Sequence, residues 1–147
     1  MKKPNAPCPC GRMVGKRPQS YAECCGRYID DYGKTPAPDA ESLMRSRYTA
    51  FVLGRADYLL ASWDPAHRPE TLESDEGRKW LGLDVRRSHE HDAEHAEVEF
   101  VARSRVDGKG VRLHEKSRFV RRDGRWFYVD GDDMSAESQR KDFMLKP

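Results

Sequence analysis

The second half of the chain alternates apolar and polar residues, as strands do when they bury one face. The alternation runs through AEVEFVARSRV (96–106), VRLHEKSRFVRR (111–122) and RWFYVDG (125–131), and LDVRRS (83–88) is a shorter candidate. Two Asp-Gly pairs, which favour tight hairpin turns, separate the longer runs at 107–108 and 123–124. The pattern therefore predicts an antiparallel meander.

The preceding region has a helical period, because its apolar residues recur on one helix face: Met44, Tyr48, Phe51, Val52 and Leu59. Asp39 is the expected N-cap and Gly54 the expected break or C-cap, and a shorter helical piece follows at 57–61. Ser74 is expected to cap a third helix at 75–81. Helices followed by a meander predict an α+β layer structure.

Four regions follow from these patterns: an N-terminal piece at 1–30, a Gly/Pro linker at 31–38, an α+β domain at 39–131 and an irregular tail at 132–147. No apolar run reaches the ~18 to 20 residues of a membrane span, and the N-terminus lacks the apolar core of a signal peptide. We therefore expect a cytoplasmic protein.

The charge is unevenly distributed along the chain. Residues 1–34 hold seven basic and three acidic residues, a net charge of +4, whereas the other 20 basic and 22 acidic residues give −2. This asymmetry hints at an anionic partner for the N-terminal piece.

All cysteines of the chain lie in that piece, as two tight pairs: Cys8 with Cys10, and Cys24 with Cys25. Four thiolates can close a tetrahedral zinc site that has no open position for a substrate. A reducing compartment argues against disulfides, and redox chemistry of exposed thiols is the remaining alternative. We favour structural zinc, since a piece this small cannot bury a core of its own.

The motif Cys-Pro-Cys-Gly, a basic loop and Tyr-Ala-Glu-Cys-Cys-Gly (21–26) resembles the SEC-C zinc motif. The resemblance implies a zinc-bound knuckle, which in the SecA translocase contacts SecB and ribosomes. This sequence has Gly11-Arg12 where the motif has Gly-Ser, and its spacer is longer. The expected partner is a protein of the secretion or translation machinery, contacted by four basic residues: Arg12, Lys16, Arg17 and Arg27.

Alternation in the last strands predicts which side chains share a face. Leu113, Glu115, Ser117 and Phe119 share the face expected to meet the helices, and the opposite face carries His114, Lys116, Arg118 and Val120. In the last strand, Trp126, Tyr128 and Asp130 are expected to share a face.

The segments LMRSRYTAFVLG, DYLLASWDP, LHEKSRF and DGRWFYVDG are similar to those of the YchJ family, in which a SEC-C motif precedes a domain resembling nuclear transport factor 2 (NTF2). The resemblance spans about residues 8–131 and implies helices packed into a strongly curved, cone-shaped sheet around a pocket. It implies no established reaction.

The pocket candidates are Arg45, Arg47, Tyr48, Trp63, Glu115, Ser117, Trp126 and Tyr128, and Trp80 is a further aromatic residue that could line the pocket. Glu115 is the best candidate for a general base or ligand contact, because burial would raise its pKa. Simpler roles are core packing for the aromatic residues, and surface charge or ion pairs with Glu115 and Asp130 for the two arginines. The histidine-rich segment 88–97 is interpreted as a solvated hairpin connection rather than a metal site.

We therefore favour a non-catalytic zinc-binding protein, with a small-molecule enzyme or carrier built around Glu115 as the alternative. Direct nucleic-acid binding ranks last, because the basic excess is small and only Tyr21 and Tyr28 could stack on bases. The sequence also lacks a dinucleotide-binding glycine motif, a P-loop and a serine nucleophile elbow. The oligomeric state is open.

Overall fold

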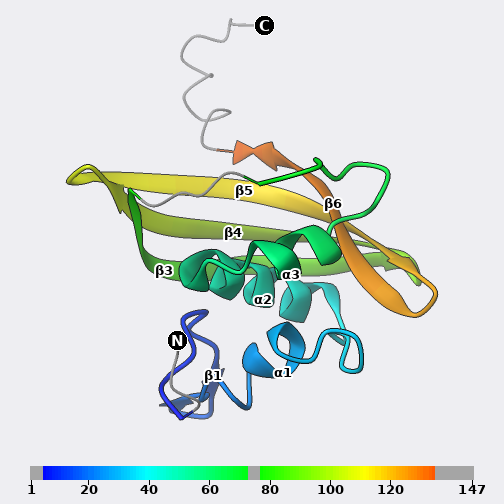
Figure 1. Cartoon of the computed structure of the whole chain (residues 1–147), viewed down its shortest axis with the longest axis horizontal. Coiled ribbons are helices and arrows are strands. Elements are labelled where there is room, and N and C mark those ends of the chain that lie inside the picture. Colours follow the sequence, from blue (N-terminus) through cyan, green and yellow to red (C-terminus); the bar gives the residue numbers. More distant parts are fainter. Residues whose placement is uncertain (1–4, 73–76, 135–147) are drawn as a thin grey trace, which may run out of the picture.

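The computed structural model of the chain describes residues 5–72 and 77–134 (Figure 1). A small hairpin comes first, formed by β1 (Met13–Val14) and β2 (Arg17–Pro18). Three helices follow, namely α1 (Gly26–Ile29), α2 (Ala40–Leu53) and α3 (Ala56–Ala61). The last four elements form one sheet: β3 (Arg78–Asp92), β4 (His95–Val106), β5 (Lys109–Arg122) and β6 (Arg125–Asp133). The α+β class is therefore confirmed.

The sheet is an antiparallel meander in the order β3-β4-β5-β6. Both predicted Asp-Gly turns are present, with φ of 52° and 80° at Asp107 and Gly108 and of 52° and 78° at Asp123 and Gly124. Two consecutive residues with positive φ match the right-handed twist of the flanking strands. These turns fix the register of β5 against both of its neighbours.

The prediction of a third helix at 75–81 is wrong where the structure describes it. Arg78 already pairs with Val106, and Trp80 pairs with Ser104, so this segment begins β3; residues 75 and 76 lie outside the described part of the chain. β3 is also much longer than the predicted 83–88. Three register shifts, at 80–82, 85–87 and 90–92, interrupt its alternation, because each bulge moves later side chains to the other face.

The ends of two other predicted regions also move. β6 runs to Asp133, so the predicted irregular tail from 132 begins as strand; residues 135–147 lie outside the described ranges. The histidine-rich connection at 88–97 is mostly strand, because β3 continues to Asp92 and β4 begins at His95. Its side chains are largely exposed, as a solvated hairpin predicts.

Helix α2 begins and ends where the sequence predicts. The Asp39 carboxylate accepts a hydrogen bond of 2.7 Å from the Ser42 amide, and Gly54 has the left-handed conformation with φ of 73°. The buried face of the helix differs from the predicted stripe, since polar Ser46 and Thr49 are fully buried whereas Phe51 is 42% exposed. Figure 1 shows the reason, because α2 lies between the sheet and the N-terminal segment.

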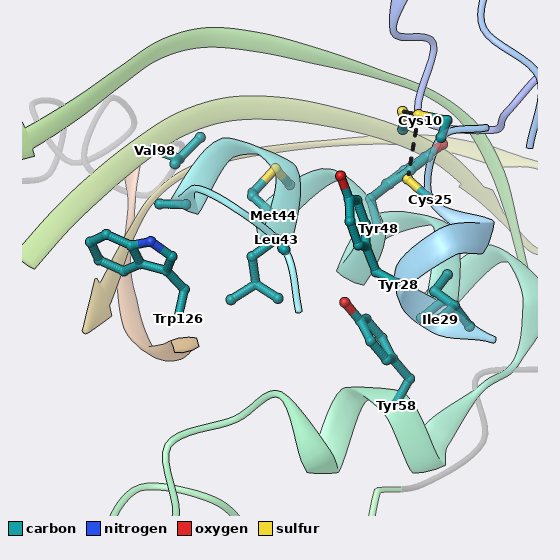
Figure 2. Packing of buried hydrophobic residues seen from close by; sticks show 14 of the residues in the cluster. Cys10, Cys25, Tyr28, Ile29, Leu43, Met44, Tyr48, Tyr58, Val98 and Trp126 are labelled. Carbon is teal, nitrogen blue, oxygen red and sulfur yellow. Dashed lines mark hydrogen bonds between the residues drawn. The ribbon is translucent and has the colours of Figure 1, made fainter. Parts of the chain in front are cut away.

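The core is continuous across these layers (Figure 2). One cluster of buried side chains joins Trp126 and Val98 of the sheet, Leu43 of α2 and Ile29 of α1, and it includes all four cysteines. The N-terminal segment is therefore packed onto the α+β domain. Among the described residues, no helix is both long and apolar enough to cross a membrane.

Candidate metal centre and cavity

The four cysteines converge on one point, with every pair of sulfur atoms within 4.8 Å. Cys10 Sγ lies 3.6 Å from Cys24 Sγ, and Cys24 Sγ lies 4.0 Å from Cys25 Sγ. In a tetrahedral site with metal–sulfur bonds of ~2.3 Å, neighbouring sulfurs are about 3.8 Å apart. The cluster thus has the size of a four-thiolate metal site, and no other described group of histidines, cysteines and carboxylates meets the same test.

Helix α2 and its neighbours enclose this cluster. All four cysteines are at most 5% exposed. Cys8 Sγ lies 3.7 Å from the Thr49 hydroxyl. Arg45 donates a hydrogen bond of 3.0 Å to the Cys10 carbonyl and also forms an ion pair of 2.9 Å with Glu41. A metal held by four thiolates carries a net negative charge, which the Arg45 guanidinium partly compensates.

The thiols of the cluster shift one another's pKa values. A hydrogen bond from Cys24, and a weaker effect of one from Cys25, lower the pKa of Cys10 to about 7. The same contacts with Cys10 raise the pKa of Cys24 and of Cys25 above the usual range of a thiol. Four thiolates this close repel one another, and a bound cation would offset that repulsion.

The four basic residues predicted to contact a partner have different environments. Arg12 donates 3.0 Å to the Ser42 hydroxyl, and Arg27 donates 3.2 Å to the Cys24 carbonyl and stacks on Tyr28. Arg12 therefore links the N-terminal segment to α2, whereas Arg27 makes its contacts within that segment. The side chains of Lys16 and Arg17 are exposed and make no hydrogen bond or ion pair with any residue that the structure describes.

These free cations lie on the β1–β2 hairpin beside exposed apolar residues. Met13 is 53% exposed and Val14 is 59% exposed. Gly15 has φ of 65°, which a tight turn with glycine in its first central position requires. The residues Met13, Val14, Lys16 and Arg17 are called the hairpin tip below.

A cavity of about 170 Å³ lies between α2 and the inner face of the sheet. Six of the predicted pocket residues line it: Arg47, Tyr48, Trp63, Glu115, Ser117 and Tyr128. The remaining wall is mostly apolar and includes Met44, Phe51, Trp80, Phe100, Ala102, Leu113 and Phe119. Of these residues, the sequence suggests a pocket role only for Trp80, and it places Leu113 and Phe119 on the inner face of the sheet.

Two predicted pocket residues lie elsewhere. Arg45 points to the cysteines rather than the cavity, because α2 turns by about 100° per residue and the two arginines fall on opposite sides. Trp126 is buried, 3% exposed, in the core outside the cavity lining. Asp130 was expected on the face of Tyr128, but Phe119 pairs with Tyr128 and Arg118 with Asp130, so a bulge moves Asp130 to the outer face.

Arg47 is a buried cation, only 6% exposed, in this apolar wall. One of its terminal nitrogens donates 2.7 Å bonds to the Leu59 carbonyl and the Ser62 hydroxyl. The guanidinium lies 4.5 Å from the ring centre of Tyr128 and 5.1 Å from that of Trp63. Burial lowers the pKa of Arg47 to about 10, so it remains charged at neutral pH. The predicted surface charge or ion pair is wrong for this residue.

Glu115 lies in the same cavity and is held from one side. One carboxylate oxygen accepts 2.6 Å from the Ser117 hydroxyl and 3.3 Å from the Tyr128 hydroxyl. Gly131 leaves room for it, because a Cβ at that position would collide with the carboxylate. Burial, and to a smaller extent the adjacent Glu115 carboxylate, raise the pKa of Tyr128, so the Tyr128 hydroxyl stays protonated and can donate a hydrogen bond. No ion pair joins Glu115 to an arginine within the described ranges.

Asp64 supports the wall of the cavity, and the sequence shows no signal for this role, because Asp64 stands only as a polar residue before Pro65 where the helical pattern ends. Its carboxylate is 1% exposed and accepts 2.9 Å from Arg122 and 2.8 Å from His67. Burial opposes ionisation, but the hydrogen bonds from His67 and Arg122 outweigh it and lower the pKa of Asp64. Its amide donates 2.7 Å to the Tyr128 carbonyl, which ties the end of α3 to β6.

Comparison with known proteins covers both parts of the chain. Residues 39–131 match the middle, NTF2-like domain of YchJ. A UPF0225 protein of Polaromonas sp. is 62% identical over 131 residues, 88% of this chain and 94% of that protein. A UPF0225 protein of Bordetella parapertussis is 54% identical over 136 residues, covering 90% and 98%.

Two solved structures are similar as well. A SEC-C motif containing protein from Rhodopseudomonas palustris has a TM-score of 0.74 at 33% identity, covering 86% of this chain and 98% of its own. A SEC-C motif containing protein from Psychrobacter arcticus has a TM-score of 0.72 at 29% identity, covering 84% and 80%. The similarity thus extends over the cysteine cluster and the cavity-bearing domain together.

Proposed function

The chain belongs to the UPF0225 family of YchJ-like proteins, and we propose that it is a non-catalytic zinc-binding protein whose metal-bound N-terminal segment docks a protein partner. Zinc is the metal that four thiolates in a closed tetrahedron favour. The site has no open position at which a metal-bound water could act, which supports a structural role. The metal would then hold the N-terminal segment, which carries the hairpin tip, against α2.

The observation that carries the docking proposal is the composition of the hairpin tip. Two apolar side chains more than half exposed lie next to two cationic side chains that have no partner within residues 5–72 and 77–134. An exposed apolar pair is suited to burial against another molecule, and the free cations favour an acidic one. The proposed partner is therefore an acidic protein surface, and the SEC-C resemblance suggests SecB or a ribosomal component.

The test uses the zinc-loaded chain with purified SecB and with ribosomes. The double variant Lys16→Glu, Arg17→Glu should weaken binding at least tenfold, and binding of the unmodified chain should fall as salt rises. Arg105→Glu, Lys109→Glu makes the same charge change near the β4–β5 turn and should leave binding unchanged. The proposal would be contradicted if both double variants bound the partner with the same affinity, or if the affinity of the unmodified chain did not change with salt concentration. Metal content by native mass spectrometry tests the zinc directly.

A second candidate function is a small-molecule carrier or enzyme that uses the cavity around Glu115. It is favoured by one observation, a carboxylate and a buried guanidinium facing the same apolar cavity. Glu115→Gln should abolish ligand binding or turnover and change the melting temperature little, because Gln still accepts from Ser117 and Tyr128. A large loss of stability would indicate a structural carboxylate instead.

A further inference from the structure

The cavity has the size of a one-ring compound. An apolar protein cavity of about 150 Å³ accepts benzene, and this one measures about 170 Å³. Its walls are mainly aromatic, with Phe100 and Phe119 from the sheet. Trp80 packs 5.9 Å from Phe51, which is 42% exposed, so this pair lies where the cavity reaches the surface. A flat ring could enter there and stack between aromatic faces.

Arg47 leaves hydrogen-bonding capacity unused at one side of the cavity. Both of its hydrogen bonds come from a single terminal nitrogen, and its other two nitrogens have no acceptor among the residues that the structure describes. A buried guanidinium has five donors, and an unmet donor in an apolar setting costs free energy. This side of the cavity therefore favours a hydrogen-bond acceptor on the ligand.

Glu115 leaves capacity unused as well. Both of its hydrogen bonds arrive at the same carboxylate oxygen, from Ser117 and Tyr128. The second oxygen has no donor in the described part of the chain. A ligand group that donates a hydrogen bond would satisfy it.

The two charges also limit the net charge of the ligand. One cation and one carboxylate already balance each other in a largely apolar space, and each interacts electrostatically with the other. A ligand with a net charge would leave an uncompensated charge where the effective dielectric is low. A neutral ligand keeps the balance and satisfies both groups.

We propose that the cavity binds a planar, net-neutral compound of one ring that carries a hydrogen-bond acceptor and a separate donor. The acceptor meets the free edge of Arg47, and the donor meets the free oxygen of Glu115. This inference rests on the second candidate function, since it names the ligand class of that cavity. It is independent of the docking role of the hairpin tip.

The test titrates the zinc-loaded full chain with small probes, using calorimetry for affinity and amide NMR shifts for location. 3-Hydroxybenzamide and 4-hydroxybenzamide carry both groups, benzoate is an anion, and toluene has neither group. At least one hydroxybenzamide should bind about tenfold or more tightly than benzoate and toluene, the effect of one added charge-assisted hydrogen bond. The shifted amides should belong to cavity-lining residues.

Variants locate the two contacts. Glu115→Gln and Arg47→Lys should each reduce the preference for the hydroxybenzamide over toluene about tenfold, while toluene binding itself stays similar. Glu97→Gln, which removes the same charge from the outer face of β4, should have no effect. Leu113→Trp should reduce binding of every probe by filling the cavity.

The outcomes distinguish failure of the proposed ligand class from failure of the second candidate function. Toluene that binds as tightly as both hydroxybenzamides overturns the ligand class and leaves a cavity that binds small molecules. Tighter binding of benzoate overturns the charge argument alone. No binding of any probe, with shifts absent from the cavity, overturns both the ligand class and the second candidate function.

Discussion

Loss of the proposed metal should destabilise far more than the N-terminal segment. The change is removal of the metal by a chelator, or the variant Cys24→Ser. Tyr28 and Ile29 of α1 are 4% and 3% exposed and belong to the same core cluster as Leu43 of α2. A side chain of this size contributes roughly 2 kcal/mol when fully buried. Release of α1 would therefore cost about 4 kcal/mol from these two side chains alone, against a total stability of ~5–15 kcal/mol for a typical domain.

The expected result is a lower melting temperature of the whole chain, by about 10 °C or more for a domain of this size. Circular dichroism melts and amide hydrogen exchange of α2 measure it, because Thr49 and Arg45 of α2 face the cysteines. Glu23→Gln changes an exposed neighbour of Cys24 and serves as the control. An unchanged melting temperature, with the α2 amides as protected from hydrogen exchange as before, would refute the reasoning. It would show that the cysteine cluster stabilises only the N-terminal segment.

Two further changes test buried polar contacts. Asp64→Asn should destabilise by about 2 kcal/mol at neutral pH, and the difference from the unmodified chain should shrink below about pH 4. A carboxyl group whose pKa is lower in the folded chain than in the unfolded chain stabilises the fold above the unfolded pKa, and this stabilisation is lost as the pH falls through the folded pKa. Thermal melts of both proteins over a series of pH values test this, and a stability difference that does not change with pH would contradict it. Ser46→Ala should cost more than Tyr58→Phe. The Ser46 hydroxyl donates to the Leu43 carbonyl, so the Tyr58 hydroxyl donates to Ser46 at 2.6 Å and becomes a buried unmet donor in the alanine variant. Urea denaturation of both variants measures which loses more free energy of unfolding. A larger loss in Tyr58→Phe would indicate that the Ser46 hydroxyl donates to Tyr58 instead.

Local chemistry made much of the fold predictable. The Asp-Gly turns require positive φ, and Asp39 and Gly54 end α2 through contacts within a few residues. Such signals depend on short stretches of chain, so the sequence alone carries them. The cysteine cluster was predictable for a related reason, since thiolate metal sites depend on ligand type and number.

The errors arose where tertiary packing overrides the local pattern. A bulge at 80–82 interrupts the alternation at the start of β3, so the strand period is not visible in residues 78–81. Another bulge places Asp130 opposite Arg118, where it forms an ion pair of 2.6 Å. Whether Arg45 or Arg47 enters the cavity depends on the two layers that pack against α2, and nothing in the helix itself decides it.

The edges of the sheet affect the solubility of the protein. β3 and β6 are the outermost strands, and an uncovered edge can pair with another copy of the chain. β3 carries three irregularities along with charged residues such as Lys79, Arg86 and Arg87, and β6 ends in Asp132 and Asp133. Interrupted ladders and like charges brought side by side oppose edge-to-edge aggregation. These strands therefore protect the protein against polymerisation through its sheet.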